Sequence, residues 1–373
     1  MLMPAALDVR PPSVTTTGFA DGLGRRSIRF DREGGTTLEC LHVRPELAAF
    51  EHALRGQAQA IMGLDDERLV RVRAFERNDG RLVIVSELLA GDRLSDIIEA
   101  RAAGESAVSG IDAAFGFLLQ ILPALSAMHG VSVVHGALGP GRIVLTTTAQ
   151  VVIADTIYGT ALPRLNLSRH RLWNELGVAV PPSVGAVRLD ASADVAQAAL
   201  AALMLALGRS VTGVNPGALA GLIREVAEIA QIRGGESLAE RVREFFASTL
   251  PMAGRRSEVT AEQAAADARA IASRQLGEDT CLAALADFAR YDAPETRKPV
   301  PEIRRSAAIA VVVPEPPTIM AEPVRPAVVT TRAQDAPVPS PPTPVSPSPE
   351  ATVRIEAEPP AGYAPPRLAR ILE

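Results

Sequence analysis

The stretch VVHGALGPGRIVL, from Val133 to Leu145, decides how the rest of the chain is interpreted. In it, His135 follows two β-branched residues, a Gly-Pro turn comes next, and an apolar run closes the stretch. This pattern is typical of a loop that leads into a short buried strand. Two interpretations are open at this point. The loop is the remnant of an active site, or it is an ordinary turn before an apolar strand.

Composition limits the class of protein. The chain has 373 residues, of which 47% are apolar and only 3% aromatic, so its core must be built from Leu, Ile, Val and Ala. The formal net charge of −5 gives no reason to expect a nucleic acid or an anionic membrane as a partner.

Several features favour a reduced, cytoplasmic setting. Cys40 and Cys281 lie far apart and lack the spacing of metal ligands. The opening residues, MLMPAALDVRPP, lack the basic start and the apolar stretch of a signal peptide. The longest apolar stretch, Val195 to Gly208, is shorter than the roughly 20 residues that span a bilayer, so we expect a buried helix and no membrane span. The bias toward Ala, Arg, Gly and Pro fits a GC-rich bacterial genome.

The order of predicted elements indicates an α+β protein with two lobes. Residues 1–17 are expected to be disordered. Residues 18–89 favour strands, with a hairpin turn at Gly34-Gly35, one helix in PELAAFEHALRGQAQAIMGL and two further strands joined by the turn NDG. Residues 90–292 are mostly helical around two short strands, RIVLT and QVVIADT, which an irregular stretch follows.

A Pro-rich tail, residues 293–373, holds nineteen of the thirty prolines. Such a segment cannot bury enough apolar area to offset its ordering cost, so we expect disorder or polyproline II structure. The tail is either a spacer or a ligand for an aromatic-lined groove, and its last residues, PPRLARILE, could form a short helix that anchors a partner.

Six segments in order resemble the eukaryotic-type Ser/Thr protein kinase domain over residues 18–290. LVRVRAFERNDGRLVIVSELLAGDRLSDII is similar to the last N-lobe strands, the hinge and the first C-lobe helix. QILPALSAMHGVSVVHGAL resembles the long helix and catalytic loop, and QVVIADT the metal-binding Asp-Phe-Gly segment. VAVPPSV, SADVAQAALAALMLALGR and FFASTLPMAGRR are similar to the end of the activation segment, the central C-lobe helix and a late helix. The resemblance implies a β-rich N-lobe, residues 18–89, and a helical C-lobe, residues 90–292.

The same resemblance implies that most groups for phosphoryl transfer are missing. In the family a strand Lys binds phosphates, a helix Glu holds that Lys, a loop Asp accepts a proton, and an Asn joins the Asp of Asp-Phe-Gly in binding Mg²⁺. The residues at the first four positions here are Glu39, Gln57, Ala137 and Arg142, so only Asp155 remains. No shift of the alignment restores the lysine, because the single lysine of the chain lies in the tail.

A bound nucleotide would lie against the remaining family positions Gly22, Gly24, Glu87, Leu89 and Asp155. Gly22 and Gly24 match a partial glycine-rich loop or form an ordinary hairpin turn. Glu87 and Leu89 occupy the hinge, where the small Ser86 leaves the back of the pocket open unless apolar side chains close it. Asp155 is either a metal ligand or a turn-capping residue.

Other positions also carry two interpretations. His135 is expected to support the loop rather than to act as a base. Arg142 either supplies positive charge in place of a metal or is solvated beside the Pro-Gly turn. Ser183 stands where the family has a Glu that pairs with a late-helix Arg, here Arg255 or Arg256, so we expect residues 157–188 to be mobile.

The sequence therefore predicts a degenerate pseudokinase that requires no cofactor. It would act as a scaffold or regulatory binding protein in signalling and engage another protein through its C-lobe or its tail. The alternative is a sensor that binds ATP without turnover, with a doubtful role for Mg²⁺. A third hypothesis is an atypical phosphotransferase in which Asp190 or Glu175 joins Asp155 as a second metal ligand.

Overall fold

The structure is a computed structural model that describes residues 20–31, 34–102, 110–178, 180, 187–211, 216–251 and 257–290. The predicted disordered N-terminus, the Pro-rich tail, Ser183, Arg255 and Arg256 lie outside the described residues.

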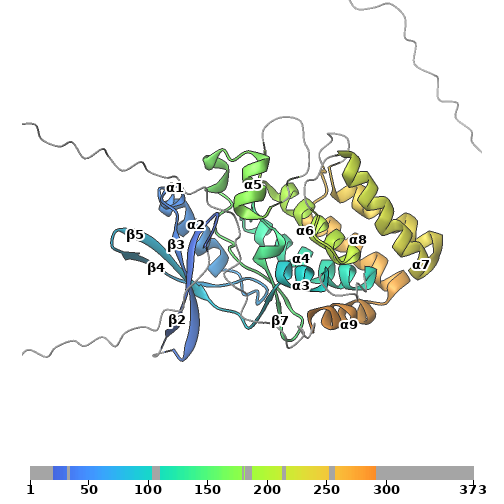
Figure 1. Ribbon diagram of the computed structural model, residues 1–373, viewed down its shortest axis with the longest axis horizontal. Coiled ribbons are helices and arrows are strands. Elements are labelled where there is room, and N and C mark those ends of the chain that lie inside the picture. Colours follow the sequence, from blue (N-terminus) through green and yellow to red (C-terminus); the bar gives the residue numbers. More distant parts are fainter. Residues whose placement is uncertain are drawn as a thin grey trace, which may run out of the picture. The chain divides into compact units, whose positions relative to one another are not determined.

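The N-lobe is built on an antiparallel sheet with the strand order β1-β2-β3-β5-β4 (Figure 1). The strands are β1 (Ala20–Asp21), β2 (Gly24–Asp31), β3 (Thr36–Val43), β4 (Val72–Asn78) and β5 (Arg81–Glu87). β2 pairs with β3 from Gly24–Val43 to Asp31–Thr36, which confirms the predicted hairpin. β4 and β5 confirm the two strands predicted around NDG.

Two helices, α1 (Pro45–Ala48) and α2 (Glu51–Met62), connect β3 to β4 where the sequence predicted one. The helix is interrupted at Phe50, whose backbone angles (φ −102°, ψ 23°) are not helical. The buried residues of α2 lie at helical spacing, as expected for an amphipathic helix on a sheet: Leu54, Gln57, Ala58 and Ile61.

The C-lobe combines a small sheet with a helical bundle. The sheet has the order β6-β7-β8 and consists of β6 (Gly91–Arg93), β7 (Ile143–Thr146) and β8 (Val151–Ile153). The helices are α3 (Leu94–Ala102), α4 (Ile111–Gly130), α5 (Arg169–Leu176), α6 (Ala191–Leu207), α7 (Pro216–Thr249), α8 (Ala261–Ile271) and α9 (Glu278–Ala289). α7 is two helices that meet at the non-helical Gly234 and Gly235.

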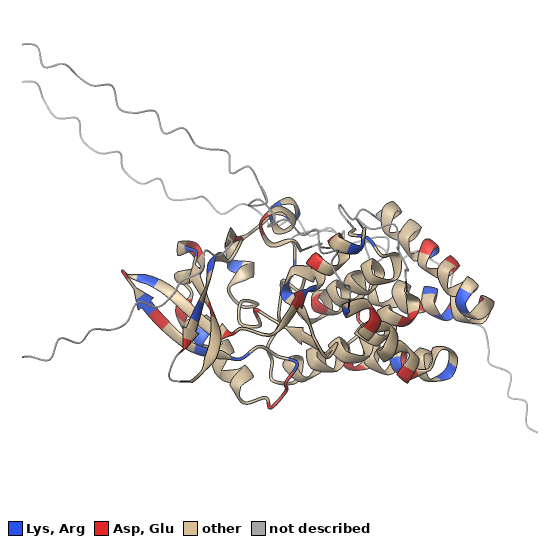
Figure 2. Cartoon of the chain, turned by 60° about the horizontal axis from the view of Figure 1, so that its bottom comes forward, with Lys and Arg blue, Asp and Glu red and all other residues tan. Residues whose placement is uncertain are grey.

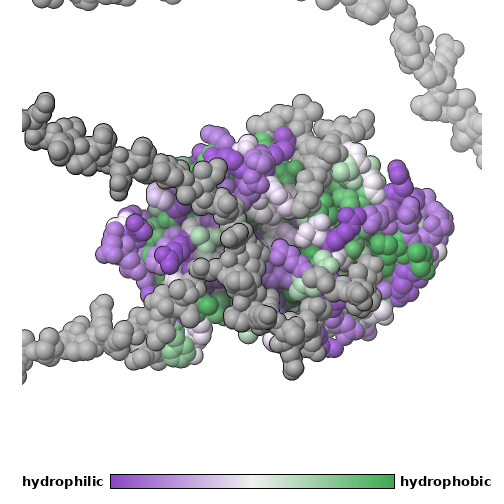
Figure 3. Space-filling view, viewed as in Figure 1, coloured by the Kyte–Doolittle hydropathy of each residue, from purple (hydrophilic) through white to green (hydrophobic). Residues whose placement is uncertain are grey.

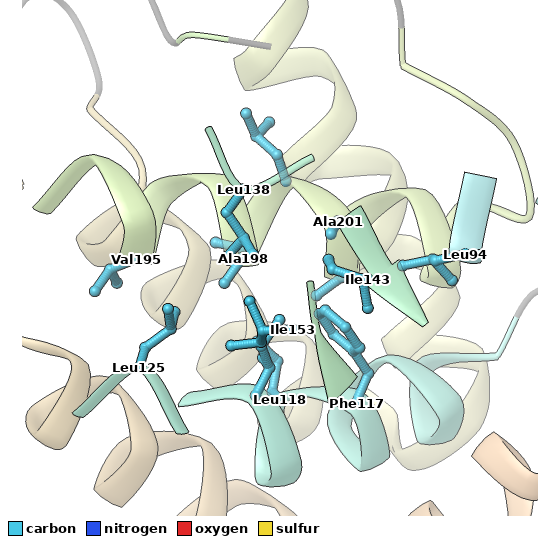
Figure 4. Packing of buried hydrophobic residues seen from close by; sticks show 14 of the residues in the cluster. Leu94, Phe117, Leu118, Leu125, Leu138, Ile143, Ile153, Val195, Ala198 and Ala201 are labelled. Atoms are coloured by element: carbon cyan, nitrogen blue, oxygen red, sulfur yellow. The ribbon is translucent and has the colours of Figure 1, made fainter. Parts of the chain in front are cut away.

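The core of the C-lobe forms where α4 and α6 pack against β7 and β8 (Figure 4). Phe117 and Leu118 of α4, Ile143 of β7 and Ile153 of β8 are fully buried. α6 is buried over most of its length, which confirms the buried helix predicted from Val195 to Gly208. Aliphatic residues dominate this core, as the low aromatic content predicted.

The stretch after β8 was expected to be irregular, and this expectation was wrong for its described part. It forms a 3₁₀ helix, Leu162–Leu165, and then α5, which begins at the N-cap Ser168 and ends at Gly177. The Ser168 side chain accepts a hydrogen bond from the Arg171 N–H, and Gly177 adopts the left-handed conformation common after a helix. Local capping therefore produces order that the hydrophobic pattern did not predict.

Among the described residues, α4 is the one helix long and apolar enough to cross a bilayer, and it is longer than the stretch singled out in the sequence. Two thirds of its most apolar window is buried inside the domain, and a core helix meets the same criteria. Among the described residues, Arg is interspersed with Asp and Glu (Figure 2). The face shown in Figure 3 is mostly hydrophilic, with smaller apolar patches.

One buried carboxylate fixes the loop at His135 and Gly136. Asp194 of α6 is fully buried and accepts hydrogen bonds at 2.8 Å from the backbone N–H groups of His135 and Gly136. It also lies 3.0 Å from Nε2 of His129. This carboxylate anchors the loop to the central helix of the C-lobe.

We predict that Asp194→Ala lowers the free energy of unfolding by about 3–5 kcal/mol, because it leaves buried donors without an acceptor. Asp190→Ala is the matched control on the same helix, since Asp190 caps α6 by accepting from the Ala193 N–H. The loss of this cap should cost about 1 kcal/mol. Urea unfolding of both variants measures the two values, and equal losses would contradict the anchoring role.

Candidate functional site

The guanidinium of Arg26 connects the N-lobe sheet to the loop after β8. Arg26 is on β2, and its Nη2 donates to Oδ2 of Asp155 at 2.7 Å. Its Nη1 donates to the Glu39 carboxylate on β3, and its Nε donates to Oδ2 of Asp21 at 3.0 Å. The Arg26 side chain is only 3% exposed, so one buried cation joins three carboxylates from three different segments.

Glu39, at the position of the family's lysine, is therefore paired with cations. Besides Arg26, it lies 3.3 Å from Nη2 of Arg93, which follows the hinge. Its negative charge would oppose a nucleotide phosphate, but within this cluster it has two positive partners. In this ion pair the cation, Arg26, lies on β2 and the carboxylate, Glu39, lies on β3.

Arg142, at the position of the family's asparagine, is buried rather than solvated, so the solvated interpretation was wrong. Its Nε is 3.6 Å from Oδ2 of Asp155, and its Nη1 donates to the carbonyl of Leu176 at the end of α5. Burial lowers the pKa of Arg142, although the Asp155 charge opposes that shift. Arg142 places positive charge beside Asp155, as the alternative interpretation required.

Asp155 follows β8 in the left-handed backbone conformation, with φ +59°. Burial would raise its pKa, but the guanidinium groups of Arg26, Arg142 and Arg93 outweigh burial and lower that pKa to about 2. Burial likewise opposes the charge of Arg26, and its carboxylate partners, Asp155 first, raise the Arg26 pKa well above the usual value. Both groups are therefore ionised at neutral pH.

Gln57 and His135 hold the loops around this cluster. Gln57 of α2 accepts hydrogen bonds from the N–H of Thr160 at 3.1 Å and from its hydroxyl at 3.0 Å. His135 is fully buried; its Nε2 donates to the Ala154 carbonyl at 2.8 Å, and its Nδ1 accepts from the Ala137 N–H. Burial lowers the pKa of His135, so the neutral ring serves as a structural support.

Ala137 is buried beside His135 and carries no group that could accept a proton. The resemblance predicts the family's loop Asp at this position.

The two glycines of the partial loop are required by close backbone contacts within the protein. A Cβ atom on Gly22 would lie 2.3 Å from the carbonyl oxygen of Glu175 in α5. A Cβ atom on Gly24 would lie 2.1 Å from the carbonyl oxygen of His42 on β3, and Gly24 has φ +153°. Both positions therefore need glycine without any contact to a nucleotide. Ser27, in place of the third glycine, is buried and lies 3.3 Å from the His42 ring.

The hinge is tied to neighbouring strands. The N–H of Glu87 donates to the Arg71 carbonyl at 3.2 Å, and the N–H of Leu88 donates to the Thr37 carbonyl at 3.1 Å. The Glu87 carboxylate pairs with Arg73, and Leu89 is half-buried in the segment before β6.

A small cavity of about 10 Å³ lies behind Asp155, between Val70, Val72, Ile84 and Ser86 and the segment 155–158. It has room for one water molecule. The buried Thr156 hydroxyl on its wall has no hydrogen-bond partner among the described residues, and a water here would satisfy it. The small Ser86 side chain therefore leaves space at the back of the cleft, but little of it.

The proposed second metal ligands have other partners. Asp190 caps α6, and Glu175 pairs with Arg44 and Arg171. No group of three or more His, Cys, Asp or Glu side chains in the described part of the chain could hold a metal ion. Burial raises the pKa of both cysteine thiols, that of Cys281 to about 12, so neither thiol is activated.

Sequence reasoning missed Arg26 and Asp194. Nothing in the sequence distinguishes Arg26 from the adjacent Arg25, which is exposed. A signal for Asp194 was present in the sequence, because a carboxylate in a mostly apolar helix, once buried, needs several hydrogen-bond donors.

No protein-family model and no curated protein matches this sequence. Among solved structures, a crystal structure of the Mycobacterium tuberculosis PknI kinase domain matches with a TM-score of 0.50 at 17% identity, covering 72% of this chain and 100% of that one. A second structure of that domain matches with a TM-score of 0.49 at 15% identity, covering 71% of this chain and 100% of that one. At this identity the likeness concerns the fold alone.

Together with the sheet order and the helical C-lobe, the first of these matches shows that this chain has the two-lobe protein-kinase-like fold. The predicted fold class is confirmed.

We predict that protonation of Asp155 lowers stability as the pH falls from about 4 to about 2. Its pKa is near 3.9 in an unfolded chain and about 2 in the folded protein, so its ion pairs contribute fully above about pH 4 and are lost as the pH falls through about 2. This difference is worth roughly 2 kcal/mol.

Urea unfolding of the wild type and of Asp155→Asn between about pH 5 and pH 2 measures the effect. Asp155→Asn should lack the loss of stability that protonation of Asp155 causes in the wild type. If the free energy of unfolding depends on pH in the same way in both proteins, folding does not lower the pKa of Asp155, and the prediction is wrong.

Proposed function

We propose that this chain is a pseudokinase, a protein-kinase-like domain that binds other proteins in signalling and does not transfer phosphate. The observation that carries the proposal is the buried Arg26 guanidinium, which bonds to both Glu39 and Asp155. It occupies the space where a nucleotide phosphate or a metal ion would have to meet Asp155.

The rate enhancement that the missing catalytic groups would supply is large enough to support a lack of phosphoryl transfer. A positioned general base is worth about 10² to 10⁴ in rate, and Ala137 cannot supply one. The loss of a phosphate clamp or a metal ligand costs a further 3–4 kcal/mol each, by analogy with the loss of one oxyanion donor. Glu39 in place of a cation and Arg142 in place of a metal ligand would each lower the rate of phosphoryl transfer further.

The ATP-sensor alternative requires a rearrangement. Arg26 would have to leave Asp155, and that step would expose a buried carboxylate to a polyphosphate of the same charge. The cavity at Asp155 measures about 10 Å³, room for one water molecule, whereas ligand pockets enclose about 300–1,000 Å³. We therefore favour a binding role, exercised through the C-lobe or the Pro-rich tail, over nucleotide sensing or atypical phosphotransfer.

Thermal unfolding of the full chain with ATP, with and without Mg²⁺, tests this proposal. ATP at about 100 times its dissociation constant would stabilise by about 2.7 kcal/mol, which corresponds to roughly 5–10 °C for a domain of this size. We expect no shift for the wild type. In Arg26→Ala the Glu39, Asp21 and Asp155 carboxylates lose their shared cation, so the midpoint without ligand should fall by several degrees, and ATP with Mg²⁺ should still give no shift.

Arg29→Ala is the control for this experiment, because Arg29 lies on the same strand but pairs with the half-exposed Glu76. Its midpoint should fall by clearly less, because the ion pair that it removes is partly exposed. A clear shift of the wild type with Mg²⁺ and ATP, or Mg²⁺-dependent phosphorylation that disappears in Asp155→Ala, would contradict the proposal.

A further inference from the structure

Helix α5 is bonded to both lobes at the mouth of the cleft. On the N-lobe side the Gly22 N–H donates to the Glu175 carbonyl at 2.6 Å. Arg44 Nη1 donates to the Glu175 carboxylate at 2.7 Å and to the Gly22 carbonyl at 3.0 Å. On the C-lobe side Arg142 donates to the carbonyl of Leu176. Two adjacent residues of one helix thus connect the N-lobe to the C-lobe.

The end of α5 suits these partners electrostatically. The last carbonyls of a helix carry partial negative charge and lack partners within the helix. The guanidinium of Arg142 and the amide of Gly22 satisfy two of them. This arrangement needs a glycine at position 22, because a side chain there would collide with the carbonyl of Glu175.

α5 contributes little to the hydrophobic core. Of its eight side chains only Leu172 and Leu176 are buried. It is flanked by Asn166 and Gly177, both with left-handed backbone (φ +48° and +63°), where the chain changes direction. A segment with so few buried apolar contacts opens at a lower free energy than the core around it.

We propose that α5 is a detachable strap that holds the lobes together through Gly22, Arg44 and Arg142 and opens while both lobes stay folded. Opening would uncover Leu172 and Leu176 of α5 and the Gly22 turn. The inference goes beyond the proposed function, because it concerns how the lobes are joined and does not depend on whether a nucleotide binds.

The full chain offers a direct reporter, because its single tryptophan, Trp173, lies in α5. Arg44→Glu places two carboxylates together and should detach the strap, and Glu175→Arg should act in the same way. The double variant R44E/E175R restores the pair with reversed polarity. We expect red-shifted Trp173 emission and about three- to tenfold faster amide exchange over Arg169–Leu176 in each single variant. The double variant should recover part of the protection, because a carboxylate at position 44 restores the ion pair but cannot donate to the Gly22 carbonyl.

Two controls separate the strap from general destabilisation. Arg171→Ala removes only the pair within α5, between Arg171 and Glu175, and should leave the strap closed. Gly22→Ala should open it, whereas Gly56→Ala, where a Cβ meets no atom within 4 Å, should not. Exchange in α6 should stay unchanged in all of these variants. The inference is overturned if α5 exchanges as slowly as α6 in every variant, or if the charge swap fails to restore protection.

Discussion

A guanidinium buried between carboxylates is stable only while all of its charged partners are in place. The contact between the two lobes of this protein depends on that constraint. Arg26 and Asp155 are each almost fully withdrawn from water. Desolvation of either charge alone costs several kcal/mol, and the opposite charge offsets this cost only while both are in place. The N-lobe strand that carries Arg26 and the C-lobe loop that carries Asp155 are therefore held in one relative position by the protein itself.

The charges of the cluster balance one another within the protein. With Glu39 on β3 and no lysine in the lobes, Asp155 would have no cation unless another side chain or a metal supplied one. Arg26 supplies it from β2, while Arg142 adds positive charge from the C-lobe. Local charge balance in the cleft is thus achieved with side chains alone. Gln57, Gly22 and Arg44 of the N-lobe then bind Thr160 and Glu175, which follow β8 in the chain.

The sequence was sufficient to predict most of the fold. Hydrophobic periodicity and turn residues identified the β2–β3 hairpin, the β4–β5 pair and helices α4 and α6, because each of these is stabilised by local pattern and burial together. α5 was missed because its residues are mostly polar and its order comes from caps and from contacts with distant segments. The break between α1 and α2 was missed for a similar reason, since no Pro or Gly marks it.

The site was predictable only in part. The order of motifs predicted that Glu39, Gln57, Ala137 and Arg142 replace family residues, but it could not show what these side chains contact. Arg142 was expected in solvent because it follows a Pro-Gly turn, yet the end of α5 covers it. Arg26 was not predicted at all, because its role depends on Asp155, which lies 129 residues away. Pairings of this kind are set by tertiary structure.

The most direct test of this account is the coupling energy between Arg26 and Asp155, measured by urea unfolding of Arg26→Met, Asp155→Asn and the double variant. If the pair holds the cleft, each single change should cost about 3–5 kcal/mol, and the double variant should cost clearly less than their sum, with a coupling of about 2 kcal/mol or more. Losses that add within about 0.5 kcal/mol would show that the two charges act independently, and would contradict the view that Arg26 takes the place of a metal or a phosphate at Asp155.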